Sequence, residues 1–203
     1  VTQAEQGIFY NQTNITNLIV GKDVMGVGDY AFANCGLRSV QFGNGLGCLG
    51  NYAFANCGNL TDVKFELSSS LSIIGSHAFN NCVSLKSIDL PGNIQQLGDS
   101  AFEGCQNLEN IKLVHSEYAG SLTGMGQSVF KDCSKLTSLE FPYTYGTAVD
   151  VSEFEGCVNL SYIKTNGNSS FALKEGDVQG FGFKEFKETV LKAFYLEGPK
   201  NGA

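Results

Sequence analysis

Hydrophobic and polar positions follow one repeating pattern along most of the chain. Each repeat contains a six-residue block with apolar residues at positions 1, 4 and 6, as in LRSVQF at 37–42 and LTDVKF at 60–65. The alternating apolar positions at the end of the block are typical of a strand with one buried face, and the first apolar residue predicts a strand that is entered from a corner. We therefore predict strands at 15–20, 37–42, 60–65, 85–90, 108–113, 136–141 and 160–165.

A second block, with the form G-x-x-A-F-x-x-C, precedes every strand after the first. Its clear copies lie at 28–35, 50–57, 75–82 and 98–105, and two weaker copies lie at 126–133 and 150–157. Good N-cap residue types follow the glycine, so we expect one helical turn in each block. These expected caps are Asp29, Asn51, Ser76 and Asp99.

The two blocks together form a repeat of about 23 residues, with a short turn and a second apolar pair such as Ile73 and Ile74 between them. One such unit cannot bury its apolar face alone, so the units are expected to stack. Stacking would place equivalent strands side by side, about 4.8 Å apart, in one long parallel sheet. The expected architecture is a repeat solenoid.

The combined pattern, LxxIxL followed by IGxxAFxxCxxL, resembles the BspA-like leucine-rich repeat, which is found mostly in bacterial surface proteins and also in some protists. The resemblance covers roughly residues 15–165. It implies an α/β repeat solenoid wound into a right-handed superhelix, with a parallel β-sheet on the concave face and short helical turns opposite. We assign 1–165 to six or seven repeats. Residues 166–203 lack AFxxC and are assigned to an atypical closing segment, with a helix near 183–190 and a strand near 191–196.

Composition excludes some partners of this 203-residue chain. Its net charge is −7 and its pI is about 4.8, whereas nucleic-acid binding needs clustered Lys and Arg. The sequence has no apolar run long enough to span a bilayer, so we expect no direct membrane insertion. Because the chain begins at Val1 rather than Met, we expect a processed or excised segment.

The recurring cysteines are open to four interpretations. A zinc site would need CxxC pairs or nearby histidines, and His77 and His115 are isolated. A nucleophile would need its own base, which six near-equivalent cysteines cannot all have. Disulfides are the serious alternative in an extracellular setting, although parallel side chains keep Cβ atoms too far apart and the count of seven is odd.

We favour buried free thiols that pack as small apolar residues, with all seven blocked to reagents until the protein unfolds. The cysteines in register are Cys35, Cys57, Cys82, Cys105, Cys133 and Cys157, and Cys48 falls outside it. The phenylalanine of each block should form an inner stack beside the cysteines. This stack comprises Phe32, Phe54, Phe79, Phe102, Phe130 and Phe154.

The outward positions of the strands are the first candidate ligand contacts. One column of these positions alternates in charge from Lys64 onward, which indicates a self-neutralising ladder between neighbouring strands. The column contains Gln41, Lys64, Asp89, Lys112, Glu140 and Lys164. Of these, we include Lys112 and Glu140 in the predicted contact site.

Irregular segments near the end of the array are the second candidate. The longest unit contains HSEYAGSLTG at 115–124, and PYTYG follows at 142–146. Exposed tyrosines often anchor protein recognition, and loops tolerate functional insertions. We predict a contact patch of Tyr118, Tyr143, Tyr145 and Tyr162. The alternative, that these loops only complete repeats of irregular length, stays open.

The resemblance implies a non-enzymatic cell-surface or secreted module for protein recognition or adhesion. We expect a monomer, extracellular and of bacterial origin, that binds a protein or glycan on another cell or in a matrix, with no catalytic, cofactor-binding or metal-binding residue. The alternative is a structural spacer that presents another domain of a larger surface protein. An enzyme is disfavoured because no acid, base or metal ligands converge in the repeat.

Overall fold

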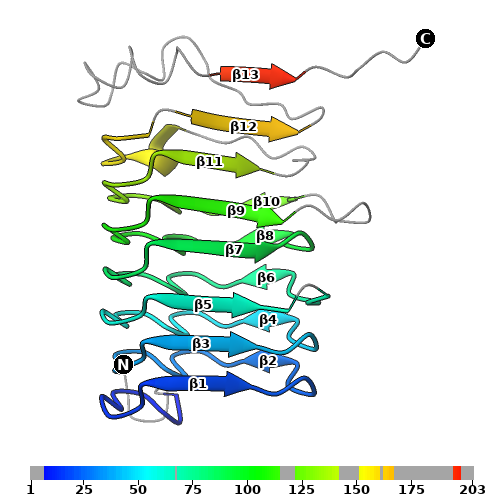
Figure 1. Cartoon of the computed structure of the whole chain (residues 1–203), viewed down its shortest axis with the longest axis vertical. Coiled ribbons are helices and arrows are strands. Elements are labelled where there is room, and N and C mark those ends of the chain that lie inside the picture. The colour runs from blue at the N-terminus through cyan, green and yellow to red at the C-terminus, as the bar shows by residue number, and fades with distance from the viewer. Residues whose placement is uncertain are drawn as a thin grey trace.

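The chain folds as a β-solenoid in which each repeat forms one rung, and successive rungs stack along a single axis (Figure 1). This computed structural model describes residues 7–66, 68–114, 122–141, 151–160, 162–166 and 194–197. Every rung from the first to the fifth contributes a longer strand to one side and a two-residue strand to the other. Within the described residues the only helical element is the short 3-10 helix η2 (Val151–Phe154).

The longer strands form where the apolar pattern predicts them, and each begins two residues into its block. The first apolar residue and its polar neighbour form the corner instead, and corner residues such as Leu37 and Leu60 are fully buried. The longer strands are β1 (Asn17–Val20), β3 (Ser39–Phe42), β5 (Asp62–Phe65), β7 (Ser87–Pro91), β9 (Asn110–Val114), β11 (Ser138–Phe141), β12 (Tyr162–Asn166) and β13 (Phe194–Glu197).

The prediction of one long sheet is wrong, because the longer strands divide into two parallel sheets, β1-β3-β5 and β7-β9-β11-β12-β13. The short strands, which were expected only as extended pieces, pair with one another in a third parallel sheet. The right-handed superhelix and the concave face stay predictions. The short strands are β2 (Gly26–Val27), β4 (Cys48–Leu49), β6 (Ile73–Ile74), β8 (Gln96–Leu97) and β10 (Gly124–Met125).

The AFxxC blocks form turns rather than the expected helical turns in every rung from 28–35 to 126–133. Two positions of each block adopt a positive φ, as Tyr30 (55°) and Asn34 (59°) do, whereas an α-helix needs negative φ throughout. This conformation directs alternate N–H groups to the next rung. Phe32 N donates to Ala53 O at 2.8 Å, and the same bond recurs along the array.

The expected N-caps serve a different purpose. Their side-chain oxygens do accept backbone N–H groups, but those groups belong to the following rung. Asp29 Oδ1 accepts from Asn51 N at 2.6 Å, and Asn51 Oδ1 accepts from Ser76 N at 2.8 Å. Asp99 Oδ1 accepts from Gln127 N at 2.8 Å in the same way. These side chains therefore join rungs instead of beginning helices.

The core confirms the predicted phenylalanine stack and extends it by one ring, Phe9. Neighbouring rings from Phe9 to Phe154 lie 5.0–5.9 Å apart between centroids and within 9° of parallel. Phe54, Phe79, Phe102 and Phe130 are completely buried. The equal spacing follows from the rung repeat, because each ring occupies the same position in its own rung.

Glycine at the corner after the short strands β4, β6, β8 and β10 is required by close stacking. A Cβ added at Gly75 would lie 2.7 Å from the carbonyl carbon of Gly50, the equivalent residue of the previous rung. A side chain at this corner would therefore push neighbouring backbones apart. The glycine of the G-x-x-A-F block is thus a spacing requirement.

The closing segment contributes one described strand. β13 pairs in parallel with β12, with Phe194 opposite Ile163, and it overlaps the strand predicted near 191–196. The helix predicted at 183–190 lies outside the described residues. The division of the chain at residue 165 stays a prediction.

Truncation of the central ring tests this packing. We expect Phe79→Ala to lower the free energy of unfolding by about 3–5 kcal/mol, because it removes contacts with both neighbouring rings and leaves a cavity. Chemical denaturation of the purified chain measures the change. Ile73→Ala is the control, since Ile73 is 41% exposed on the same rung and should cost much less. Equal losses for the two variants would contradict the register of the stack.

Candidate functional site

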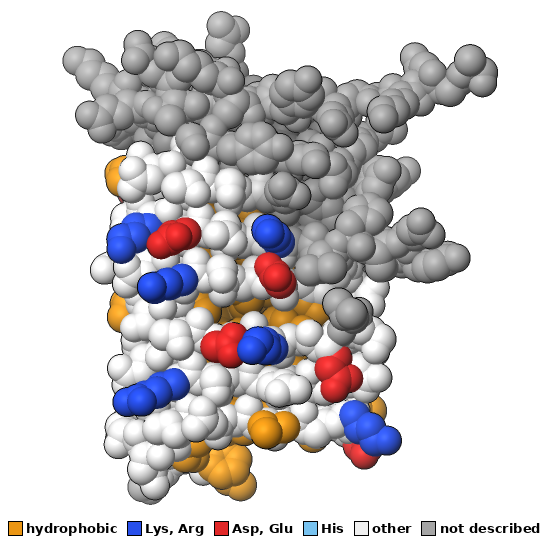
Figure 2. Space-filling model, viewed as in Figure 1, with side chains coloured by type: hydrophobic (Ala, Val, Ile, Leu, Met, Phe, Trp, Pro, Cys, Tyr) orange, Lys and Arg blue, Asp and Glu red, His pale blue; other side chains and the backbone are white. Residues whose placement is uncertain are grey.

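The outward side chains of β1, β3, β5, β7, β9 and β11 form one broad surface, here called the strand face. Strict parallel register places equivalent positions side by side, for example Ser39 next to Asn17 and Asp62. Figure 2 shows charged side chains of both signs scattered over this face, with uncharged surface between them. The face is therefore a candidate for recognition of a large ligand rather than a pocket.

Several polar side chains on the strand face and at the corner just before it are held by contacts between rungs. Ser39 Oγ donates to Asn17 Oδ1 at 2.7 Å. Thr61 Oγ1 donates to Arg38 O at 3.2 Å, and Thr137 Oγ1 donates to Glu109 O at 3.0 Å. Because these side chains are already oriented, a ligand that contacts them loses less side-chain entropy on binding.

The register of the charged column is as predicted over its second half. Asp89 lies opposite Lys112, Lys112 opposite Glu140, and Glu140 opposite Lys164. Lys64 departs from the ladder: its ammonium contacts Asp62 of its own strand at 3.1 Å. Both side chains of this pair are well exposed, so the pair contributes little to stability.

Lys64 lacks a paired neighbour on the β7 side because the strand face is interrupted there. No hydrogen bond joins β5 to β7, although both strands are wholly described. In the neighbouring rungs the equivalent bonds run from Thr61 N to Arg38 O at 3.0 Å and from Glu109 N to Lys86 O at 2.8 Å. We call this interruption the seam, and Figure 1 shows wider spacing at β5–β7 than at β3–β5.

The seam opens on one side of the solenoid only. On the opposite side β6 pairs with both β4 and β8, and within the turns Phe54 N donates to Ala78 O at 2.8 Å. Phe54 and Phe79 also remain stacked at 5.5 Å. Figure 2 shows a band of hydrophobic surface crossing the middle of the strand face.

Pro91 provides a physical cause for the seam. The residues at its position in the two preceding rungs are Gly43 and Glu66, whose N–H groups donate to Val20 O and Phe42 O at 2.9 and 3.2 Å. Proline has no N–H and is tolerated mainly at the edges of sheets. β7 is accordingly the edge strand of its sheet, and it turns its proline-bearing side toward β5.

The predicted contact residues are only partly placed by the structure. Lys112 is exposed on β9, and Glu140 lies opposite it on β11. Tyr162 belongs to β12, opposite Ser138. The backbone therefore brings these three positions into adjacent rungs. Tyr118, Tyr143 and Tyr145 lie outside the described residues, so the tyrosine patch stays a prediction.

A row of stacked rings on the turns was not anticipated from the sequence. Tyr30 and Tyr52 stack at 4.6 Å between centroids, and Tyr52 and His77 at 4.4 Å. His77, which appears isolated in the sequence, therefore lies at the end of an aromatic row. The signal was available, because all three residues occupy the same position of the block.

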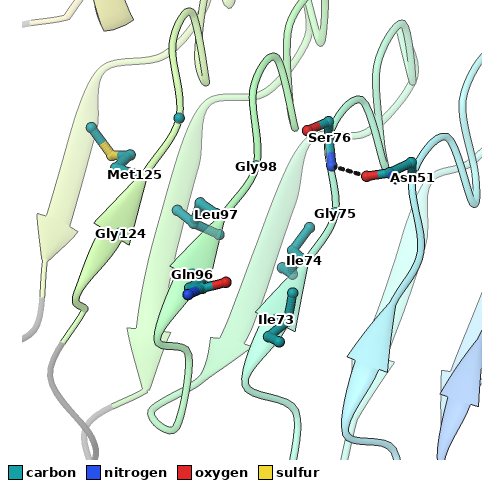
Figure 3. Close-up of a pocket in the computed structure, with 11 residues that line it drawn as sticks. Asn51, Ile73, Ile74, Gly75, Ser76, Gln96, Leu97, Gly98, Gly124 and Met125 are labelled. Carbon is teal, nitrogen blue, oxygen red and sulfur yellow. Dashed lines mark hydrogen bonds between the residues drawn. The ribbon is translucent and has the colours of Figure 1, made fainter.

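A shallow groove of about 360 Å³ follows the corner next to the short strands (Figure 3). Its base contains the corner glycines Gly75 and Gly98, and the side chains of Ile73 and Gln96 lie beside it. Asn51 also borders the groove, but its side-chain oxygen is used by Ser76 N. None of the residues that line the groove is ionisable, so it offers no acid or base.

The six cysteines in register are buried, as predicted, and each thiol also makes a hydrogen bond. Cys57 Sγ donates to Phe32 O at 3.2 Å, and Cys82 Sγ donates to Phe54 O at 3.3 Å. Burial raises the pKa of Cys57 and of Cys105 to about 12. These thiols therefore stay protonated near neutral pH, and a protonated thiol is neither a nucleophile nor a metal ligand.

The described parts of the chain offer no metal centre and no membrane-spanning helix. There, no three His, Cys, Asp or Glu side chains gather in a way that could hold a metal ion. No described helix is long and apolar enough to cross a membrane.

Comparison with known proteins agrees with this geometry. The sequence profile of the BspA type Leucine rich repeat region matches six copies, over residues 2–120 and 64–174. The chain belongs to the BspA-type leucine-rich repeat family. Proteins of this family typically take part in protein interactions and are generally not enzymes. None of the curated protein sequences is significantly similar to the chain.

The solved structure of a bacterial leucine-rich repeat protein shares the fold of this BspA-type chain. The T. pallidum leucine-rich repeat protein TpLRR is 22% identical, with a TM-score of 0.62 over 95% of this chain and 88% of that one. A leucine rich cell surface protein from Faecalibacterium prausnitzii is 25% identical, with a TM-score of 0.48 over 79% and 34% of the two chains. The pneumococcal vaccine antigen PcpA is 13% identical, with a TM-score of 0.48 over 82% and 62%.

Thiol reactivity tests the cysteine assignment. The prediction that all seven cysteines are blocked is wrong for Cys48, which is exposed on β4. We expect an alkylating reagent at neutral pH to modify Cys48 alone in the native BspA-type chain, and all seven cysteines after denaturation. Mass spectrometry counts the modified sites. Rapid native modification of Cys82 or Cys105 would contradict the burial of the row.

Restoring the missing donor tests the origin of the seam. We expect Pro91→Ala to let residue 91 donate to Phe65 O and draw β7 toward β5, so that the amides of Ser87 and Asp89 exchange with deuterium more slowly. Glu66→Pro is the reciprocal variant, because it removes the bond from Glu66 N to Phe42 O and should speed exchange in β5. Unchanged exchange in both variants would show that proline does not control strand pairing here.

Proposed function

We propose that this chain is a non-enzymatic recognition or adhesion module of a bacterial cell-surface or secreted protein, and that its strand face binds a protein or glycan of a host cell or matrix. The observation that carries the proposal is the strand face itself. Its polar side chains are placed in register and oriented by hydrogen bonds between rungs. The buried phenylalanine stack holds the rungs behind it in place.

Membership of the BspA-type family supports an extracellular location, because repeats of this type are found mostly in bacterial surface proteins. Burial of six of the seven cysteines is compatible with an oxidising environment, since their thiols are shielded from reagents. The exposed charges of β5, β7 and β9 are of both signs. A partner with mixed polar and charged groups therefore complements the face better than a polyanion does.

A spacer is the second candidate. The continuous bonds between rungs in the turns and in the short-strand sheet make the array a suitable rod. A spacer would present another domain of a larger protein and would itself bind nothing. Saturable binding separates the two functions.

The test is a binding screen of the purified chain against arrays of matrix proteins and glycans. We expect at least one saturable interaction. The double variant Asn110→Ala with Lys112→Ala alters the strand face on β9, away from the seam, and should weaken the interaction about tenfold, which equals about 1.4 kcal/mol. The matched control is Gln95→Ala with Gln96→Ala on the short-strand side, where both residues are exposed.

Two results would count against this function. The absence of saturable binding across the arrays would favour the spacer. Binding that is lost in the glutamine control but kept in the β9 variant would move the site to the short-strand side. Tyr143→Ala with Tyr145→Ala tests the tyrosine patch separately, because it should weaken the same interaction if these rings contact the ligand.

A further inference from the structure

We propose that a protein partner docks an arginine side chain at the end of the seam where Pro91 faces Phe65. This inference rests on the proposed function and names the chemistry of the partner group. Backbone groups that are hydrogen-bonded between the other rungs are not bonded across the seam.

The seam leaves backbone acceptors of β5 without donors. The carbonyls of Arg38, just before β3, and of Phe42, at its end, accept N–H groups from the next rung. The equivalent carbonyls of the β5 rung are those of Thr61, just before β5, and Phe65, with Val63 between them by alternation, and no hydrogen bond reaches them from β7. Val63 is 6% exposed, so its carbonyl has little access to bulk water. A carbonyl without a donor and with little access to water favours a ligand that brings one.

At the end of the seam near Pro91 there are fewer backbone N–H donors than carbonyl acceptors. On the β7 edge that faces β5, Ser87 and Asp89 each have an N–H group, but Pro91 has none to donate to Phe65 O. Among the described residues Phe65 O therefore has no backbone donor, even when the two strands approach each other. An external donor fits this end best.

Negative charge flanks the same end. Glu66 follows Phe65 directly, Asp89 precedes Pro91 by two residues, and both are exposed. Among the described residues neither carboxylate takes part in an ion pair, since Lys64 contacts Asp62 and the other pair joins Lys131 to Glu155. The cations nearest in register are Lys64 at the equivalent position of β5, Lys86 just before β7 and Lys112 opposite Asp89, and none of them forms an ion pair with Asp89.

An aromatic ring completes the surroundings. Phe65 stacks on Phe42 at 4.9 Å between centroids. Phe42 is fully buried, whereas Phe65 is only partly buried. A cation near a partly exposed ring gains from its quadrupole.

A guanidinium group uses all three features together. It is planar, carries five N–H donors, remains charged and is weakly hydrated, so it can bond to a carbonyl and a carboxylate while lying against a ring. An ammonium group lacks the planar fork, and a neutral amide lacks the positive charge that Glu66 and Asp89 attract. The net charge of −7 also favours the approach of a basic segment.

The test is an NMR titration of the full 15N-labelled chain with the capped tripeptide Gly-Arg-Gly. Capped Gly-citrulline-Gly is the matched probe, because citrulline has a similar shape without the charge. We expect the amides of Glu66, Ser87 and Asp89 to shift with the arginine peptide, and binding to be about tenfold weaker for the citrulline peptide. Equal binding of the two probes, or shifts confined to other rungs, would overturn the proposal.

Three variants sharpen the test. Asp89→Asn should weaken arginine binding severalfold, whereas Asp23→Asn, which removes one exposed carboxylate elsewhere, should leave it unchanged. Pro91→Ala should abolish it by closing the seam. Retained binding in both Asp89→Asn and a folded Pro91→Ala variant would refute the site.

The outcome can be separated from that of the proposed function. If the arrays yield a partner whose affinity is unaffected by Asp89→Asn and Pro91→Ala, the module binds elsewhere and the seam inference fails alone. If the tripeptide binds as expected but the arrays yield no saturable interaction, the seam site stands and the adhesion function fails.

Discussion

Hydrogen bonding between equivalent backbone groups of successive rungs is the constraint on which the rest of this structure depends. Each rung presents the same N–H and C=O groups at the same height, and the next rung must match them. Every other ladder follows from that match, including the phenylalanine stack, the thiol contacts and the corner glycines. The residue type at each position is therefore constrained by the equivalent residue of the next rung, rather than by its neighbours in sequence.

This constraint explains why cysteine recurs in the core. Each thiol fills a small buried space and also donates to the carbonyl of the phenylalanine one rung earlier, as Cys105 does to Phe79 at 3.2 Å. Alanine would fill part of that space but leave the carbonyl with one partner fewer. The same burial that raises the pKa of these thiols protects them from oxidation, because the thiolate is the reactive form.

The seam arises where one residue breaks the match. Pro91 cannot donate, so β7 becomes the edge of a sheet in the middle of the array, while the opposite side stays paired. The solenoid tolerates this because its stability is distributed over several ladders. The consequence is a row of carbonyls along β5 that receive no N–H group from β7, and such groups are a recurrent starting point for recognition. A regular array offers many equivalent positions, but only an irregular one offers a unique site.

The sequence by itself determined the repeat, the longer strands, the buried phenylalanines and the buried cysteines, because each rests on a short-range pattern of apolar residues that stacking repeats. It could not show that the AFxxC block is a turn, since Asp29 bonds to a residue of the next rung that lies 22 positions away. It also did not reveal the seam, although Pro91 was visible, because the loss depends on which backbone group faces Phe65. Only the tertiary structure decided these points, since register between rungs is a relation between distant residues.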